Sequence, residues 1–95
     1  MHIGPMKIVW DQAKANSNFE KHRIRFSDAE SVLFDPMALT REDEGIHDEQ
    51  RFVTIGTDAL DRVIVVVYTY RGEDIRLISA RRATPNERKT YEERI

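Results

Sequence analysis

The stretch Arg62–Tyr70, "RVIVVVYTY", constrains the fold of this chain more than any other. It is rich in β-branched and aromatic residues, which pack well on a pleated surface and lose side-chain freedom in a helix. It is also almost uniformly apolar, as expected for a strand that is covered on both faces. We therefore predict that residues 62–70 form a central strand of a β-sheet.

A second strand follows at once and predicts a β-hairpin. "RGED" (71–74) has the composition of a tight turn, and "IRLISARR" (75–82) is a suitable partner strand. Side chains alternate along a strand, so we expect Arg76 and Arg81 to point to opposite faces of the sheet. The alternation groups Ile75, Leu77, Ser79 and Arg81 on one face, and Arg76, Ile78, Ala80 and Arg82 on the other.

The remaining elements give an α+β order. "MKIVW" (6–10) predicts a short strand, and a helix over 12–22 follows, with Asp11 as its N-cap. "SDAE" (27–30) has the pattern of a capping box, which predicts a second helix with Ser27 as N-cap, ended by Asp35-Pro36. Further strands are predicted at 37–41 and 51–57, separated by the acidic loop 42–50, and the last helix starts at "TPNE" (84–87) and runs toward Ile95.

The predicted order β-α-α-β-β-β-β-α describes one domain over residues 1–95, with helices packed on a mostly antiparallel sheet. Residues 1–5 precede a plausible natural start at Met6, so they read as a tag or an alternative start.

Composition excludes several classes of site. The chain has no cysteine, which rules out disulfides and thiolate metal ligands. It lacks a glycine-rich phosphate loop, a His-Glu-x-x-His sequence and a nucleophile elbow, so no cofactor and no metal are expected. The longest apolar run, 63–67, is too short to span a bilayer, and the N-terminus lacks the pattern of a signal peptide. We expect a cytoplasmic protein without membrane contact.

The charge distribution points to an anionic ligand. The net charge is −2, but residues 1–61 hold twelve acidic and seven basic side chains, whereas residues 62–95 hold eight basic and five acidic ones. Eleven of the fifteen cations are arginine, the better bidentate phosphate ligand. A pI near 5.9 argues against indiscriminate binding of duplex nucleic acid.

Arginines on the predicted sheet are the first candidate site. A face edged by Arg51, Arg71 and either Arg76 or Arg81 would bind an anion without a metal. We expect Arg81 to contact phosphate, and Arg82 to pair with a carboxylate or a protein partner. The alternative is that these arginines pair with the acidic loop 42–50 or cap helices.

"KHRIRF" (21–26) is the second candidate site. Cations here suit the C-terminal end of the helix dipole, which is one interpretation of Lys21 and His22. The other makes His22 a proton-transfer group and Lys21 a phosphate contact. His2 reads as a tail residue and His47 as a solvated loop residue. The aromatic side chains available for base stacking are Trp10, Tyr68, Tyr70 and Tyr91, of which Trp10, Tyr68 and Tyr70 are expected to lie mainly in the core.

Several motifs occur together and in order: the Trp-Asp start, "NFEKH", "FSDAESVLFDP", "EQRFVTIG" and "ISARRATPNER". In this combination the chain resembles the BrnT-type toxins, the ribonuclease half of a type II toxin–antitoxin pair. The resemblance spans nearly everything after Met6. It implies a RelE-like fold, metal-independent endoribonuclease activity on RNA and inhibition of translation.

The resemblance also implies a partner, a small antitoxin that neutralises the toxin, binds operator DNA and represses its own operon, commonly in a two-plus-two complex. Operator DNA would be contacted only through the antitoxin. The family usually has "KHG" where this chain has "KHR", so Arg23 must occupy a position where glycine can adopt a left-handed cap. The motifs carry over as candidate catalytic residues Lys21, His22, Arg51, Arg71, Arg76, Ser79 and Arg81.

Two other functions fit the same residues. RelE-like folds also host non-catalytic binding proteins, which act on a protein target or as co-repressors with a DNA-binding antitoxin. A purely structural protein would have all its arginines paired internally.

Overall fold

The computed structural model describes residues 7–45 and 48–93, and these form a five-stranded sheet with helices on both sides. The elements follow one another as β1 (Ile8–Val9), α1 (Gln12–His22), α2 (Phe26–Ala29), the 3-10 helix η1 (Glu30–Phe34), β2 (Leu39–Asp43), β3 (Arg51–Thr57), β4 (Val63–Arg71), β5 (Asp74–Arg82) and α3 (Pro85–Glu92). The α+β class and the mostly antiparallel sheet are confirmed. The predictions for residues 1–5, His2, His47 and the helix end at Ile95 lie outside the described residues.

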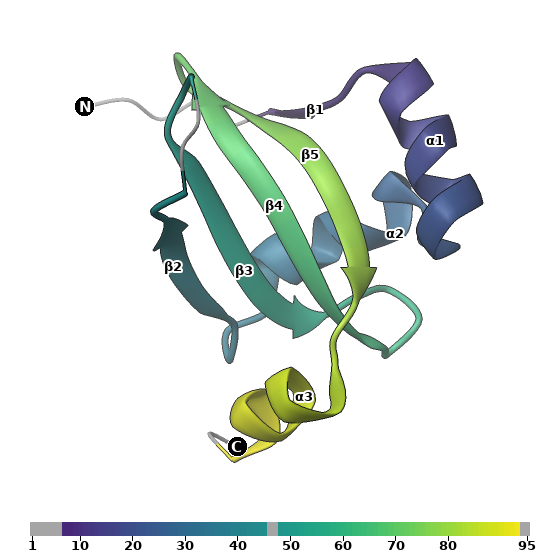
Figure 1. Cartoon of the computed structure of the whole chain (residues 1–95), viewed down its shortest axis with the longest axis vertical. Coiled ribbons are helices and arrows are strands. Elements are labelled where there is room, and N and C mark those ends of the chain that lie inside the picture. The colour runs from purple at the N-terminus through teal and green to yellow at the C-terminus, as the bar shows by residue number, and fades with distance from the viewer. Residues whose placement is uncertain (1–6, 46–47, 94–95) are drawn as a thin grey trace.

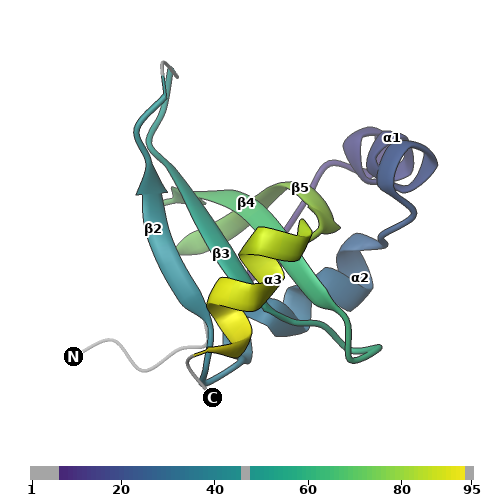
Figure 2. The same ribbon diagram turned by 60° about the horizontal axis from the view of Figure 1, so that its bottom comes forward.

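The sheet has the strand order β1-β5-β4-β3-β2, so β4 is its central strand, as the apolar run predicts. β1 pairs with β5 in parallel, over only two residue pairs, and all other neighbours are antiparallel. Figure 1 shows α2 running behind the strands, and Figure 2 shows α3 in front of β3 and β4. None of the described helices is long and apolar enough to cross a membrane.

The core lies between the sheet and the first helices. Ile64, Val66, Ala80 and their neighbours on one face of β4 and β5 pack against Phe26 and Ala29 of α2 and against α1. We call this the core face of the sheet. The opposite face is the α3 face, because α3 lies on it through Glu87 and Tyr91.

Strong local signals set the ends of two helices. Asp11 caps α1 by accepting a hydrogen bond from the amide of Lys14, and Thr84 and Glu87 form the predicted capping box at α3. Both predictions are confirmed. These side-chain oxygens accept hydrogen bonds from amides that a helix start leaves without partners.

Two predicted boundaries are wrong. Ser27 is not an N-cap: the N-cap of α2 is Arg25, two residues earlier, and no side chain caps the helix. The element is a single α-turn that continues as a 3-10 helix, because burial of Phe26, Ala29 and Val32 sets its path rather than a cap. β2 lies at Leu39–Asp43 instead of 37–41, since Asp35 first forms a turn by accepting a hydrogen bond from the Met37 amide.

Candidate active site

A β-bulge in β5 decides which side chains share a face. Val67 of β4 lies opposite Ser79, but the next residue, Tyr68, lies opposite Leu77. Ile78 is therefore an extra residue in β5, and it shifts the alternation by one position. As a result Arg76, Ser79 and Arg81 all project on the α3 face.

This outcome corrects the alternation predicted from the sequence. Arg76 and Arg81 share the α3 face instead of lying on opposite faces. Arg82 lies on the other side of the sheet, the core face, where its register partner in β4 is Ile64. The prediction assumed an unbroken strand, in which parity never changes. The bulge changes it once, between Leu77 and Ser79.

Two further arginines of the predicted site lie on the same face. In the strand register, Arg71 at the end of β4 lies opposite Asp74 of β5, and Arg51 at the start of β3 lies opposite Asp43 of β2. Both arginines occupy positions on the α3 face. Five of the seven residues predicted for the site thus lie on one face: Arg51, Arg71, Arg76, Ser79 and Arg81.

Three guanidinium groups on this face have hydrogen-bond donors without an acceptor among the described residues. Arg51, Arg71 and Arg76 form no ion pair with any residue in the described ranges 7–45 and 48–93. The Nε of Arg51 is buried and has no acceptor within those ranges. Buried donors without acceptors are rare in folded proteins, so this group is suited to an anionic ligand.

Arg81 is engaged within the protein. Its two terminal nitrogens donate to the two carboxylate oxygens of Glu87 at 2.8 and 2.9 Å. The Arg81 guanidinium, with help from the Thr84 amide and against the effect of burial, lowers the pKa of Glu87 from 4.5 to about 2. The same hydrogen bonds raise the pKa of Arg81. Arg81, rather than Arg82, therefore pairs with a carboxylate, because Arg81 lies on the face that α3 covers. Contact of Arg82 with a protein partner stays a prediction.

A hollow of about 470 Å³ lies beside this ion pair, between α3 and the strands β2 and β3. Its floor is apolar, formed by Leu39, Val53 and Ile55, and Arg41 and Glu87 also line it. The α3 face thus combines a row of cations with a recess. No group of three or more His, Cys, Asp or Glu side chains in the described part of the chain is arranged to hold a metal ion.

Lys21 and His22 are not on the α3 face. They form the last turn of α1, whose buried Ala15 belongs to the core-face cluster. One turn before them, Asn18 is 93% buried, and its side chain bonds to β5: its Nδ2 donates to the carbonyl of Ala80 and its Oδ1 accepts from the amide of Ala80. Asn18 therefore joins the helix carrying Lys21 and His22 to the strand carrying Ser79 and Arg81.

Sequence reasoning missed the residue that fixes α3. Asp35, predicted only as a helix end, accepts hydrogen bonds from the Tyr91 hydroxyl at 2.5 Å and from the Thr57 amide at 2.9 Å. Burial opposes ionisation of Asp35, but these hydrogen bonds outweigh it and lower its pKa. Burial and the bond to Asp35 raise the pKa of Tyr91. The partners lie 22 and 56 residues away, so no local pattern identifies them.

With its arginine side chains, the α3 face can bind and neutralise a multiply charged anion. Guanidinium groups donate bidentate hydrogen bonds to phosphate oxygens, and several of them can share the charge that develops in a phosphoryl-transfer transition state. Ser79 adds a hydroxyl on the same face.

Comparison with known proteins identifies the family of the chain. A family model described as "Ribonuclease toxin, BrnT, of type II toxin-antitoxin system" matches residues 10–87, which include all seven predicted site residues. The chain belongs to the BrnT family. The ribonuclease toxin BrnT of Brucella abortus, known from a crystal structure, is 29% identical, with a TM-score of 0.63 over 84% of this chain and 99% of that one. A search of curated proteins gives no match.

Membership in the BrnT family confirms the resemblance seen in the sequence. The family is one of ribonuclease toxins from type II toxin–antitoxin systems, which implies an RNA substrate and an antitoxin partner. The fold similarity to the Brucella toxin confirms the α+β architecture.

Proposed function

We propose that this chain is a metal-independent endoribonuclease that cleaves RNA by attack of the RNA's own 2′-hydroxyl. The observation that carries the proposal is the bulge at Ile78, which gathers Arg76, Ser79 and Arg81 beside Arg51 and Arg71 on one face. Because RNA brings its own nucleophile, the protein needs to align it, stabilise the charged phosphorus centre and move protons.

The proposed reaction forms one bond to phosphorus and breaks one. The 2′-oxygen forms a bond to phosphorus and loses its proton, while the bond from phosphorus to the 5′-oxygen breaks and that oxygen gains a proton. The products are a 2′,3′-cyclic phosphate and a free 5′-hydroxyl.

The arginines of the α3 face take the electrostatic role in this proposal. Arg51, Arg71 and Arg76 offer guanidinium groups that no described carboxylate occupies, and Glu87 holds Arg81 at the edge of the same face. His22 is proposed as a proton-transfer group and Lys21 as a phosphate contact, both on α1. The Asn18–Ala80 hydrogen bonds fix the helix that carries Lys21 and His22 relative to the strand that carries Ser79 and Arg81.

The biological consequence proposed is inhibition of translation through loss of RNA. Neutralisation falls to an antitoxin that binds operator DNA and assembles with the toxin in a two-plus-two complex. The cation-rich α3 face and its apolar recess support an antitoxin segment with both acidic and apolar side chains.

The test is cleavage of a defined RNA by purified, folded protein without antitoxin, in excess EDTA. We expect fragments with 2′,3′-cyclic phosphate and 5′-hydroxyl ends, at a rate that EDTA does not change. RNA that stays intact, or activity that EDTA abolishes, would contradict the proposal. A protein that arrests growth while RNA remains intact would instead be the non-catalytic binder.

A further inference from the structure

The corner between α1 and α2 contains an arginine in an unfavourable backbone conformation. Arg23 ends α1 with φ 59°, ψ 28°, and its amide donates to the carbonyl of Phe19 at 2.8 Å. Glycine adopts this left-handed conformation without steric cost, whereas a residue with a Cβ atom is strained there. Residues held in strained backbone conformations cluster at functional sites, so Arg23 is a candidate for a functional role.

The side chain of Arg23 lies on an aromatic ring together with a second arginine. The guanidinium carbon of Arg25 is 4.7 Å from the centroid of the Phe19 ring, and that of Arg23 is 5.5 Å away. A guanidinium held against a ring keeps its edge donors available for an acceptor. Neither arginine forms an ion pair within the described residues, and both are exposed.

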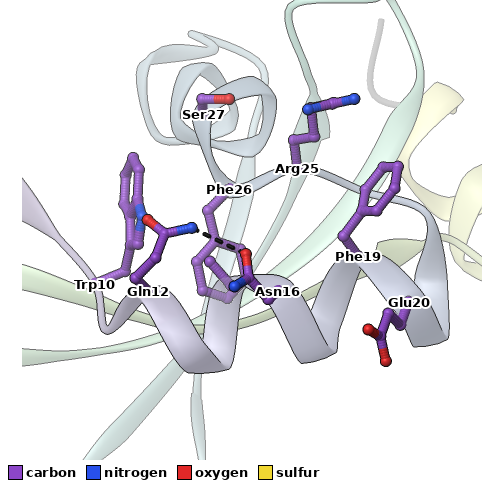
Figure 3. A pocket seen from close by; sticks show the side chains of 9 residues that line it. Trp10, Gln12, Asn16, Phe19, Glu20, Arg25, Phe26 and Ser27 are labelled. Carbon is purple, nitrogen blue, oxygen red and sulfur yellow. Dashed lines mark hydrogen bonds between the residues drawn. The ribbon is translucent and has the colours of Figure 1, made fainter.

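A hollow of about 520 Å³ opens next to these two arginines. Figure 3 shows the ring of Trp10 on one side and that of Phe19 on the other, with Gln12 and Asn16 below and Ser27 and Arg25 above. Phe26 closes the base, is almost fully buried, and meets Trp10 edge to face at 5.9 Å. The volume is within the range of small-ligand sites, and aromatic walls with amide and hydroxyl groups suit a flat heterocycle.

We propose that this α1–α2 corner binds one nucleotide unit of single-stranded RNA, with its phosphate on Arg23 and Arg25 and its base in the hollow between Trp10 and Phe19. The inference rests on the proposed ribonuclease function and extends it with a second RNA contact outside the α3 face. Stacking platforms beside cations are how proteins hold unpaired nucleotides. Lys21, in the last turn of α1, adds to the positive charge, and Glu20 is the single carboxylate among the described residues that line the hollow.

The chain carries a built-in reporter for this site. Trp10 is the only tryptophan in the sequence, so a change in tryptophan fluorescence arises from the hollow. The probe is a short RNA with 2′-O-methyl groups, which cannot be cleaved by attack of its own 2′-oxygen. We expect saturable quenching of the fluorescence as this RNA is added.

Arg23→Gly is the most informative variant, because it separates binding from folding. It relieves the left-handed strain, so the thermal midpoint should rise, while the affinity for the RNA falls about tenfold. Arg25→Ala and Phe19→Ala should also lower the affinity about tenfold. Lys14→Ala, which removes an exposed cation from the same helix, should leave it within about twofold.

Three results would overturn the inference. The first is cleavage of RNA without any quenching, and the second is quenching that Arg23→Gly and Arg25→Ala leave unchanged. The third is binding of polyglutamate as tight as that of the RNA, because the site would then recognise negative charge alone. The two proposals fail separately. Quenching without cleavage of unmodified RNA would contradict the ribonuclease function and leave the corner as an RNA site. Cleavage without quenching would support the ribonuclease function and contradict the RNA site at the corner.

Discussion

The side-chain amide of Asn18 hydrogen bonds with both backbone groups of Ala80, its Nδ2 donating to the carbonyl at 2.9 Å and its Oδ1 accepting from the amide at 3.0 Å. It thereby takes the place of a neighbouring strand at this point of β5, where β1 no longer pairs. Nδ2 also donates to the carbonyl of Ile24. One buried side chain thus holds α1, the α1–α2 connection and β5 together.

Replacing Asn18 with alanine should therefore lower the free energy of unfolding by about 2 kcal/mol, because three buried backbone groups lose their partner. Asn16→Ala is the matched control: Asn16 is exposed, and its side-chain oxygen accepts a bond from Gln12 on the same helix. It should cost no more than about 0.5 kcal/mol. Denaturant unfolding measures both, and equal losses would show that the Asn18 bonds contribute little.

Asn18→Asp adds a pH test of the same contacts. A carboxylate can still accept from the Ala80 amide, but it would face the carbonyl oxygens of Ala80 and Ile24, which favour its protonated form. The pKa of the new carboxyl should be raised, so this variant should regain stability relative to wild type as the pH falls. A constant difference between the two proteins from pH 7 to pH 4 would contradict this geometry.

The ion pair of Arg81 and Glu87 predicts a second pH dependence. Since the folded pKa of Glu87 is lowered to about 2 from 4.5, its stabilisation is fully present above pH 4.5 and is lost as the pH falls toward 2. Glu87→Gln keeps a side chain suited to the capping box but removes the charge. At pH 7 it should cost about 1 kcal/mol, since both side chains are partly exposed to solvent.

Thermal unfolding of Glu87→Gln and wild type across this pH range measures the effect. The difference between the two proteins should shrink as the pH drops from 4.5 to 2. A difference that stays the same down to pH 2 would show that Glu87 is not held by Arg81.

The hydroxyl of Tyr91 ties α3 to Asp35 and Thr57, so Tyr91→Phe should destabilise the protein by about 1–2 kcal/mol. Tyr70→Phe is the control, because Tyr70 is 46% exposed at the end of β4, and it should change stability by less than about 0.5 kcal/mol. Chemical denaturation compares the two. Equal effects would mean that the Tyr91 hydroxyl does not hold α3 in solution.

Much of this fold is predictable from local sequence, and the reason is visible in particular residues. Asp11 and Thr84 mark helix starts because their side chains bond within three residues along the chain. The run 62–70 marks β4 because its composition suits a covered strand. These signals also gave the correct order of elements.

The arrangement of the site was less predictable, because it depends on pairing between strands. The extra residue Ile78 is visible only when Val67 and Tyr68 are matched to their partners in β5. Nothing in "RLISARR" itself shows a bulge, so the sequence predicted Arg76 and Arg81 on opposite faces, whereas they share one. Glu87 could have been recognised as a partner of Arg81, since it lies six residues away at the start of the predicted helix.

The most direct test of the account compares Arg76→Ala with Arg82→Ala in cleavage of a defined RNA in EDTA. Both arginines lie in β5, but Arg76 projects on the α3 face and Arg82 on the core face. If the α3 face is the catalytic face, Arg76→Ala should lower kcat/KM about 100-fold, corresponding to about 3 kcal/mol of transition-state stabilisation, and Arg82→Ala should lower it less than about threefold. An equal loss in both variants, or a larger loss for Arg82→Ala, would contradict the assignment of the active site to the α3 face.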